Sequence, residues 1–349
     1  LYVSGNGSDD YGTVMPALIE RQRNKIAKDK IYLVGTNKKN TINAKKKYKE
    51  LSIKSTVNLN IQFYPKSSIQ DNLCYKDIIN KMTGPTCAII AVPDHLHYKI
   101  ARDCLLLGIH CLIVKPFTTK VNDALDLTRI ANQKKILGYV EFHKRLDKSN
   151  RTAKTQILNK KIGDINYITV DYSQRKEIPI VKFKKWSAKT NIFNYLGVHY
   201  VDIVYFLTGA IPKRVMAVGQ KNYLKKHKLN TYDSIQSLIE WESKNKTKFI
   251  QSINVNWIDS KSSTAMSDQK MKIIGTCGRI ELDQKNRGIS LASDEIQYSH
   301  INPDFNQSFM KEDEVFKWEG YGIDNITNFL DNLDDYLNKK ISYNTAKKI

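Results

Sequence analysis

The first 145 residues alternate short apolar runs with longer amphipathic stretches, and this alternation restricts the possible folds strongly. Some runs are apolar throughout, as strands are when helices cover both of their faces. Strands that alternate with helices in this way are typical of βα units and predict a doubly wound parallel sheet. The expected strands are Leu1–Ser4, Ile31–Val34, Ile61–Tyr64, Cys87–Val92, Cys111–Val114 and Ile136–Val140, with helices near 13–28, 40–51, 75–82, 95–107 and 121–133.

The pattern changes after Arg145, where strand-like stretches rich in β-branched and aromatic residues follow one clear helix at about Phe193–Leu207. Several of these stretches alternate apolar with polar residues, which predicts an antiparallel sheet with one open face. We therefore expect an α/β protein with a doubly wound domain over 1–145 and an α+β domain over 146–349, whose last helix spans about 323–337. The expected strands of the second domain are Tyr167–Tyr172, Arg214–Gly219, Ser234–Trp241, Phe249–Trp257, Met271–Ile274 and Arg279–Leu282.

Composition narrows the classes of function. Apolar residues make up 41% of the chain, which excludes a disordered protein, and no apolar run approaches the ~18 residues of a membrane span. The net charge of +21 comes mostly from lysines scattered along the chain, so we expect no nucleic-acid partner, although a steep salt dependence of binding would reverse that view. The five cysteines are odd in number and form no CxxC pair, so we expect neither a metal site nor disulfides. A cytoplasmic protein without a membrane segment is the expectation.

Three glycines follow the first expected strand and precede the first expected helix. Gly5, Gly7 and Gly12 are spaced GxGx4G, two residues longer than the usual dinucleotide fingerprint. Such glycines let the backbone turn tightly and approach a diphosphate at the positive end of a helix. Asp9 and Asp10 would have to point to solvent. A glycine-rich turn without a ligand is the alternative.

The end of the second expected strand carries no acidic residue. An NAD site usually places an acid here for the ribose 2′-hydroxyl, whereas a 2′-phosphate requires a basic or polar neighbour. Thr36, Asn37 and Lys38, followed by Lys39, fit the second case, so the sequence favours NADP over NAD. The alternative is that two lysines in a lysine-rich chain carry no information.

The next strand ends are also expected to face the cofactor. Ligands of open α/β sheets bind beyond the carboxyl ends of the strands. A lysine just past a buried strand is a suitable hydrogen-bond donor to a reacting hydroxyl. The expected contacts are Val92, Pro93, His97, Lys115 and Pro116.

Five motifs, in this order and at this spacing, resemble the Gfo/Idh/MocA family of oxidoreductases: GNG…G, AVPDHLHYKIA, CLIVKPF, GYVEFHKR and YLGVHYVDIVYFLTG. The resemblance covers nearly the whole chain. It implies a dinucleotide-binding Rossmann domain followed by a substrate-binding and oligomerisation domain. The implied activity is NAD(P)-dependent hydride transfer between nicotinamide and a carbinol carbon of a sugar, nucleotide-sugar or cyclitol.

The resemblance also implies roles for single residues. Lys115 corresponds to the catalytic lysine of the family's Glu-Lys-Pro motif, although Val114 stands in place of the glutamate. In the family's Asp-x-x-x-His-x-x-Asp helix, His199 corresponds to the residue that moves the hydroxyl proton and Asp202 to its partner. Tyr195 replaces the first aspartate. The spacing i, i+4, i+7 predicts that these three side chains share one helical face; a core histidine satisfied by an aspartate is the alternative.

Further residues follow from the same resemblance. His143, after the sixth expected strand, belongs to a segment implied to line the cofactor cleft, and Arg175 and Trp186 are expected to contact substrate, with ordinary packing as the alternative. A homodimer or homotetramer is implied through the open sheet. The competing hypothesis is a dinucleotide-binding regulator or scaffold without catalytic activity, which the departures at Val114 and Tyr195 keep open.

Overall fold

A computed structural model describes residues 2–5, 10–25, 29–294, 298–311 and 313–348. Contacts divide the chain into two compact units. Unit 1 comprises Leu1–Val92, Leu96–His143 and Phe305–Ile349, and unit 2 comprises Pro93–His95 and Lys144–Asp304. Within the described residues no helix is long and apolar enough to cross a membrane.

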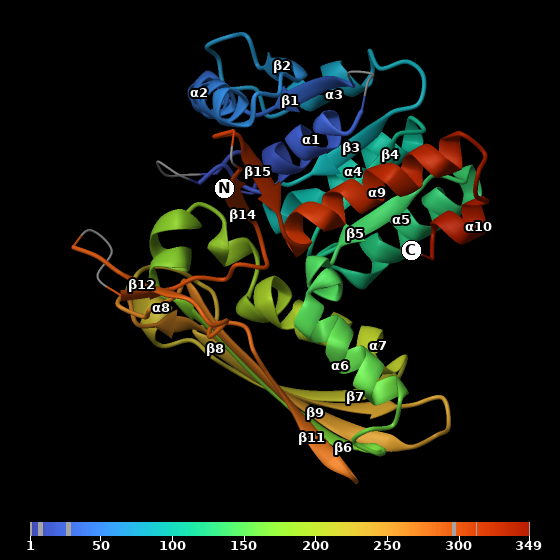
Figure 1. Cartoon of the computed structure of the whole chain (residues 1–349), viewed down its shortest axis with the longest axis vertical. Helices are drawn as coiled ribbons and strands as arrows, with labels where there is room; N and C mark the ends of the chain where they lie inside the picture. The colour runs from blue at the N-terminus through green and yellow to red at the C-terminus, as the bar shows by residue number, and fades with distance from the viewer. Residues whose placement is uncertain (1, 6–9, 26–28, 295–297, 312, 349) are drawn as a thin grey trace. The chain divides into compact units, whose positions relative to one another are not determined.

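Unit 1 contains the predicted Rossmann domain with its parallel strands (Figure 1). Strands β1 (Lys30–Val34) and β2 (Asn60–Tyr64) pair with each other, and β3 (Cys87–Ile90), β4 (His110–Val114) and β5 (Gly138–Glu141) form a second parallel ladder. The centre of β4 is inaccessible to water, as its unbroken apolar run predicts. The helices that alternate with these strands are α1 (Val14–Arg23), α2 (Lys38–Ser55), α3 (Cys74–Ile79), α4 (His97–Leu106) and α5 (Val121–Lys134).

The segment expected as the first strand has another conformation. Tyr2, Val3 and Ser4 form a turn, and Leu1 lies outside the described residues. The carbonyl of Tyr2 accepts hydrogen bonds from the amides of Thr13 and Val14, and that of Val3 accepts one from Met15. Amides at the start of a helix lack partners within it. The two carbonyls satisfy those of α1, so they are not available to a strand ladder.

The C-terminal residues belong to unit 1, whereas the sequence-based boundary placed them in the second domain. Helix α9 (Tyr321–Leu337) packs on α1 and β5, and Ile326, Phe329 and Leu330 are buried in the same core as Met15 of α1. Unit 1 also holds β14 (Gln307–Met310), β15 (Phe316–Glu319) and α10 (Tyr343–Ala346).

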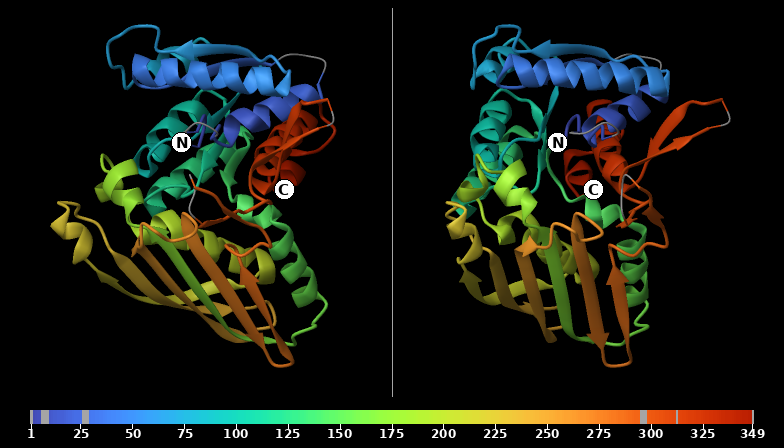
Figure 2. Two further views of the ribbon diagram at one scale, coloured as in Figure 1. Left: turned by 60° about the vertical axis from the view of Figure 1, so that its left-hand side comes forward. Right: turned by 90° about the vertical axis from the view of Figure 1, so that its left-hand side faces the viewer.

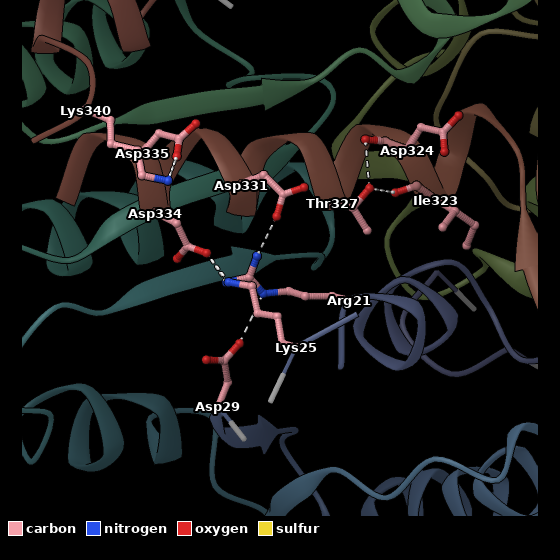
Figure 3. A network of polar contacts seen from close by, with 10 residues as sticks. All are labelled: Arg21, Lys25, Asp29, Ile323, Asp324, Thr327, Asp331, Asp334, Asp335 and Lys340. Carbon is pink, nitrogen blue, oxygen red and sulfur yellow. Dashed lines mark hydrogen bonds and ion pairs between the residues drawn. The ribbon is translucent and has the colours of Figure 1, made fainter. Parts of the chain in front are cut away.

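A polar network joins α1 to α9. The buried Arg21 guanidinium donates to Asp29 at 3.1 Å, to Asp331 at 3.0 Å and to Asp334 at 2.9 Å, and Lys25 also contacts Asp334 (Figure 3). The guanidinium presents several donors in a fixed fork, which lets one side chain hold three carboxylates. This network fixes α9 against the Rossmann core.

Unit 2 is built on a mixed, mostly antiparallel sheet, as predicted (Figure 2). Its six described strands have the order β11-β10-β6-β9-β8-β7, and only the central pair β6/β9 is parallel. Residues of α7 share a core with the inner face of the sheet, including Trp241 and Trp257. The strands are β6 (Ile165–Arg175), β7 (Ile211–Gln220), β8 (Ser234–Glu242), β9 (Lys248–Asp259), β10 (Ser267–Gly275) and β11 (Gly278–Asp283).

The predicted helix at Phe193–Leu207 has two parts. Phe193–Gly197 is a π-helical turn, and α7 (Val198–Thr208) continues from it. The other short elements of unit 2 are α6 (Lys148–Leu158), α8 (Tyr223–Lys226), β12 (Ser290–Ala292), β13 (Tyr298–His300) and the helical turns 178–182 and 187–189. The helical turn 143–146 begins with the last residue of a unit 1 segment and continues into unit 2.

Candidate functional site

The glycine turn of unit 1 depends on glycine at its first position. Gly5 has φ +73°, and a Cβ there would collide with the carbonyl oxygen of Asp10. Gly12 also has a positive φ, at +69°. Gly7 lies outside the described residues. Asp10 is exposed, as expected, and its Oδ1 also accepts a hydrogen bond from the Gly12 amide at 2.9 Å. Asp9 lies outside the described residues.

The start of α2 fits the ribose end of a dinucleotide. Asn37 is the N-cap, and its Oδ1 accepts from the Asn40 amide at 2.9 Å. Thr36 uses its carbonyl to accept from the Asp71 amide. Lys38 and Lys39 are exposed in the first turn, which contains no acidic residue. The helix N-terminus and the lysines together make this end of β1 electropositive.

His97 connects the ends of two neighbouring strands. Its ring is buried, with Nδ1 2.6 Å from the Pro116 carbonyl and Nε2 2.9 Å from the Val92 carbonyl. It therefore positions the backbone after β3 and the backbone after β4. Lys115, between β4 and Pro116, is also buried. Pro93 is grouped with unit 2, where its neighbour Asp94 accepts a hydrogen bond from Thr190 at 2.6 Å.

His143 pairs with a glutamate at the end of β5. Its Nδ1 lies 2.6 Å from Oε1 of Glu141, which is fully buried. The imidazole stacks on Tyr321, with ring centroids 5.6 Å apart, and contacts Phe305. The negative charge of Glu141 adds to burial in raising the pKa of the nearby Tyr2 phenol.

The candidate residues of unit 2 lie on α7 and the turn before it. His199 is buried at the start of α7. Asp202 accepts two hydrogen bonds from Arg145, at 2.8 and 2.5 Å. Burial raises the pKa of Asp202, and the guanidinium opposes this shift in part. The family resemblance implies His199 as the partner of Asp202 instead.

Tyr195 and Trp186 belong to an aromatic cluster. Tyr195 contacts Phe183, Trp186 and Trp257, with ring centroids 5.2 to 6.1 Å apart. Burial, together with the charge of Asp94, raises the pKa of the Tyr195 phenol. The three residues 195, 199 and 202 therefore have different surroundings, because the π-helical turn interrupts the regular helical spacing at Tyr195.

The side chain of Arg175, at the end of β6, forms a hydrogen bond with the backbone of another segment. Its Nη2 donates to the Ser263 carbonyl, and its Nε is buried with no hydrogen-bond partner among the described residues. In the described part of the chain no group of three or more His, Cys, Asp or Glu side chains forms a metal cluster.

Two charged residues were not among the sequence-predicted site residues. Glu141 is buried in unit 1, and Lys144 is buried in unit 2, with Nζ 5.9 Å from the ring centroids of Tyr172 and Tyr200. Both belong to the segment EFHKR, whose charges directly follow an apolar strand. That position at the carboxyl end of a parallel strand is the signal that could have identified them.

Two family models match the chain. The model described as "Oxidoreductase family, NAD-binding Rossmann fold" matches residues 17–142, and the model "GFO/IDH/MocA C-terminal domain" matches residues 150–281. Each lies within one of the two expected domains. The glycine turn and the start of α2 fit a dinucleotide of the kind that the first description names.

Curated relatives are similar to part of the chain. The scyllo-inositol 2-dehydrogenase (NADP(+)) IolW of Bacillus subtilis is 32% identical over 130 residues, covering 37% of this chain and 36% of the relative. The UDP-N-acetylglucosamine 3-dehydrogenase of Acidithiobacillus ferrooxidans is 28% identical over 130 residues, covering 37% and 38%. The chain thus spans little more than a third of the length of these relatives.

Solved structures resemble the fold over almost the whole chain. The scyllo-inositol dehydrogenase of Lactobacillus casei, with bound NAD(H) and scyllo-inositol, has a TM-score of 0.62 at 17% identity and covers 95% of this chain and 89% of its own. An inositol dehydrogenase homologue from Azotobacter vinelandii, complexed with NADH and myo-inositol, has a TM-score of 0.66 at 14% identity, covering 95% and 91%. At these identities the likeness establishes the fold alone.

Proposed function

Because the chain belongs to the Gfo/Idh/MocA family of oxidoreductases, we propose that it is an NAD(P)-dependent dehydrogenase or reductase acting on CH–OH groups. The substrate is a sugar, nucleotide-sugar or cyclitol. The observation that carries the proposal is the buried Lys115 directly after β4, in a Rossmann unit whose glycine turn and α2 N-terminus suit a dinucleotide. A nicotinamide cofactor, when bound, supplies the hydride acceptor or donor.

Each residue has a defined part in this proposal. Gly5 and Gly12 shape the turn that faces the diphosphate, and Thr36, Asn37 and Lys38 hold the ribose end. His97 holds the carbonyls of Val92 and Pro116 and so keeps the backbone next to Lys115 in place. Lys115 donates a hydrogen bond to the substrate oxygen, which stabilises developing alkoxide charge.

His199 takes or returns the hydroxyl proton. An imidazole suits this task because one ring nitrogen can accept a proton while the other donates one. In this proposal Asp202 holds Arg145 beside α7. Tyr195 and Trp186, whose rings are in contact, form one wall of the substrate site. Arg175 fixes the backbone at Ser263.

Cofactor binding is tested by thermal shift with NAD, NADP and their reduced forms at low salt and at 0.3 M salt. A ligand at 100 times its Kd stabilises the folded protein by about 2.7 kcal/mol. We expect stabilisation by NADP(H) at both salts. Stabilisation by none of the four, in protein shown to carry no cofactor, would overturn the proposal.

Turnover separates the enzyme from a dinucleotide-binding scaffold. The probes are scyllo-inositol, myo-inositol and UDP-N-acetylglucosamine, followed through the absorbance of the reduced nicotinamide. Lys115→Met should lose at least 100-fold in kcat, as expected for removal of an electrostatic donor, while Lys120→Met, an exposed lysine of the same unit, should not. If the protein binds a dinucleotide tightly but turns over none of a wider panel of polyols and sugars, the result would favour the non-catalytic scaffold.

We also propose a homodimer or homotetramer formed through the open face of the unit 2 sheet. Tyr167 and Ile250 are paired across β6 and β9, and both remain more than 40% exposed, as does Leu238 on β8. An apolar group of this kind on an open sheet is typical of an association surface. Light scattering of the wild type and of Ile250→Lys tests this; a wild-type monomer would contradict it.

A further inference from the structure

Glu141 is a buried carboxylate that the proposed reaction leaves without a part. It is fully inaccessible to water at the carboxyl end of β5. Oε1 faces His143 Nδ1 at 2.6 Å, and the carboxylate also lies close enough to the buried Tyr2 phenol to raise its pKa, after the effect of burial itself. A buried ionised carboxylate costs several kcal/mol unless it is well paired. Its position therefore calls for an explanation beyond packing.

The pairing determines which nitrogen of His143 carries a proton. A carboxylate only accepts hydrogen bonds, so Nδ1 is the donor, and Nε2 is the acceptor nitrogen of the neutral ring. Tyr321 stacks on the imidazole at an interplanar angle of 18°, and Phe305 lies 5.1 Å from it between ring centroids. These two rings restrict rotation of the imidazole about its own axis.

Glu141 lies at the same strand end as the residue that precedes the proposed catalytic lysine. In the β4/β5 ladder, Glu141 is the register partner of Val114, the residue that precedes Lys115. Side chains alternate between the two faces along a strand, so register partners in a sheet point to the same face. The Glu141 side chain therefore leaves the sheet at the end of β5, on the face to which the Val114 side chain points. Lys115 is the next residue after Val114.

We propose that Glu141 is a positioning residue, which fixes the tautomer and orientation of His143 at the sheet end where the dinucleotide reaction takes place. The family's Glu-Lys-Pro motif has a glutamate where this chain has Val114 on β4. Glu141 supplies a carboxylate at the same strand end, but from the neighbouring strand β5. The inference rests on the proposed function, because it takes His143 as part of the segment that the family resemblance implies to line the cofactor cleft.

The first test measures the tautomer without any ligand. Two-dimensional ¹⁵N–¹H NMR of histidine-labelled protein, with His143→Gln to assign the signal, should show Nδ1–H in the wild type. Glu141→Gln retains an acceptor and should preserve this tautomer, whereas Glu141→Leu should shift it towards Nε2–H. Glu20→Leu removes another buried carboxylate of unit 1, which pairs with Arg23, and should leave the signal unchanged. An Nε2–H wild type, or an unchanged signal in Glu141→Leu, would overturn the inference.

The second test measures kcat/KM with the dinucleotide and the best polyol or sugar substrate. Glu141→Leu should lose at least tenfold with a Tm close to that of the wild type, and Glu141→Gln should stay within threefold. Wild-type rates in Glu141→Leu, despite a changed tautomer, would exclude a positioning role. A wild type that binds no dinucleotide would overturn the proposed function and this role with it, while the NMR result would still decide whether Glu141 sets the tautomer.

Discussion

Arg145 donates two hydrogen bonds to the carboxylate of Asp202, one turn beyond His199 on α7. Asp202 is almost fully buried, whereas about a third of Arg145 is exposed. The guanidinium therefore compensates a charge that has little access to water. This ion pair ties α7 to the turn at 143–146.

Arg145→Met should destabilise the protein by about 2 kcal/mol at pH 8, because it leaves a buried carboxylate without its partner. The folded-state pKa of Asp202 is already raised, and loss of Arg145 raises it further. A group with a raised folded-state pKa contributes least above that pKa, so the deficit should shrink as the pH falls to 5. Urea unfolding at both pH values measures this; a deficit that grows at pH 5 would contradict it.

Asp10→Asn should tighten dinucleotide binding about tenfold at low salt. The Asp10 carboxylate lies on the Gly12 amide, next to the turn proposed to face the diphosphate, and opposes its charge. Asparagine keeps the acceptor for Gly12 and removes the charge. The gain should fall at 0.3 M salt. Asp123→Asn, on α5 of the same unit, changes the net charge equally and should have no effect on Kd.

Replacement of both Lys38 and Lys39 by alanine should weaken NADP binding at least tenfold and leave NAD binding within twofold. The two lysines stand at the N-terminus of α2, where only a 2′-phosphate would need them. Lys45→Ala with Lys46→Ala on the same helix is the matched control. Equal losses for NAD and NADP would mean that the lysines act through general charge.

Tyr195→Phe should keep kcat within twofold of the wild type. The phenol has a raised pKa and its ring packs against Phe183, Trp186 and Trp257, so it is a poor proton donor and a good packing group. Tyr195→Ala should destabilise the protein by about 3 kcal/mol. A large loss of kcat in the phenylalanine variant, with unchanged Tm, would instead place the hydroxyl in the proton relay.

Asp233→Ala should lower the free energy of unfolding by about 3 kcal/mol. The buried carboxylate accepts from the amides of Asn222, Tyr223 and Leu224 at 2.6 to 2.7 Å and so caps α8. Denaturant unfolding measures the change. Asp171→Ala, an exposed position of the same unit, is the control and should cost less than about 0.5 kcal/mol.

The sequence alone determined the class of fold and the segments from which the site is built. An apolar run such as that of β4 specifies a buried parallel strand, because a strand covered on both faces needs apolar side chains at every position. That requirement can be read from a short stretch of sequence. The alternating strands after Arg145 specify the open mixed sheet in the same way. Local patterns also place Lys115 at a strand end and His199 on a helix.

Tertiary structure decided which side chains meet. Arg145 and Asp202 are 57 positions apart, and the contact of Asn306 with the Gly12 carbonyl spans 294 positions. The core of unit 1 likewise recruits α9 from the far end of the chain. Hydrogen bonds and packing across such separations depend on how the elements assemble, and neither composition nor local spacing encodes them. For the same physical reason only the β4/β5 register shows that Glu141 lies opposite Val114.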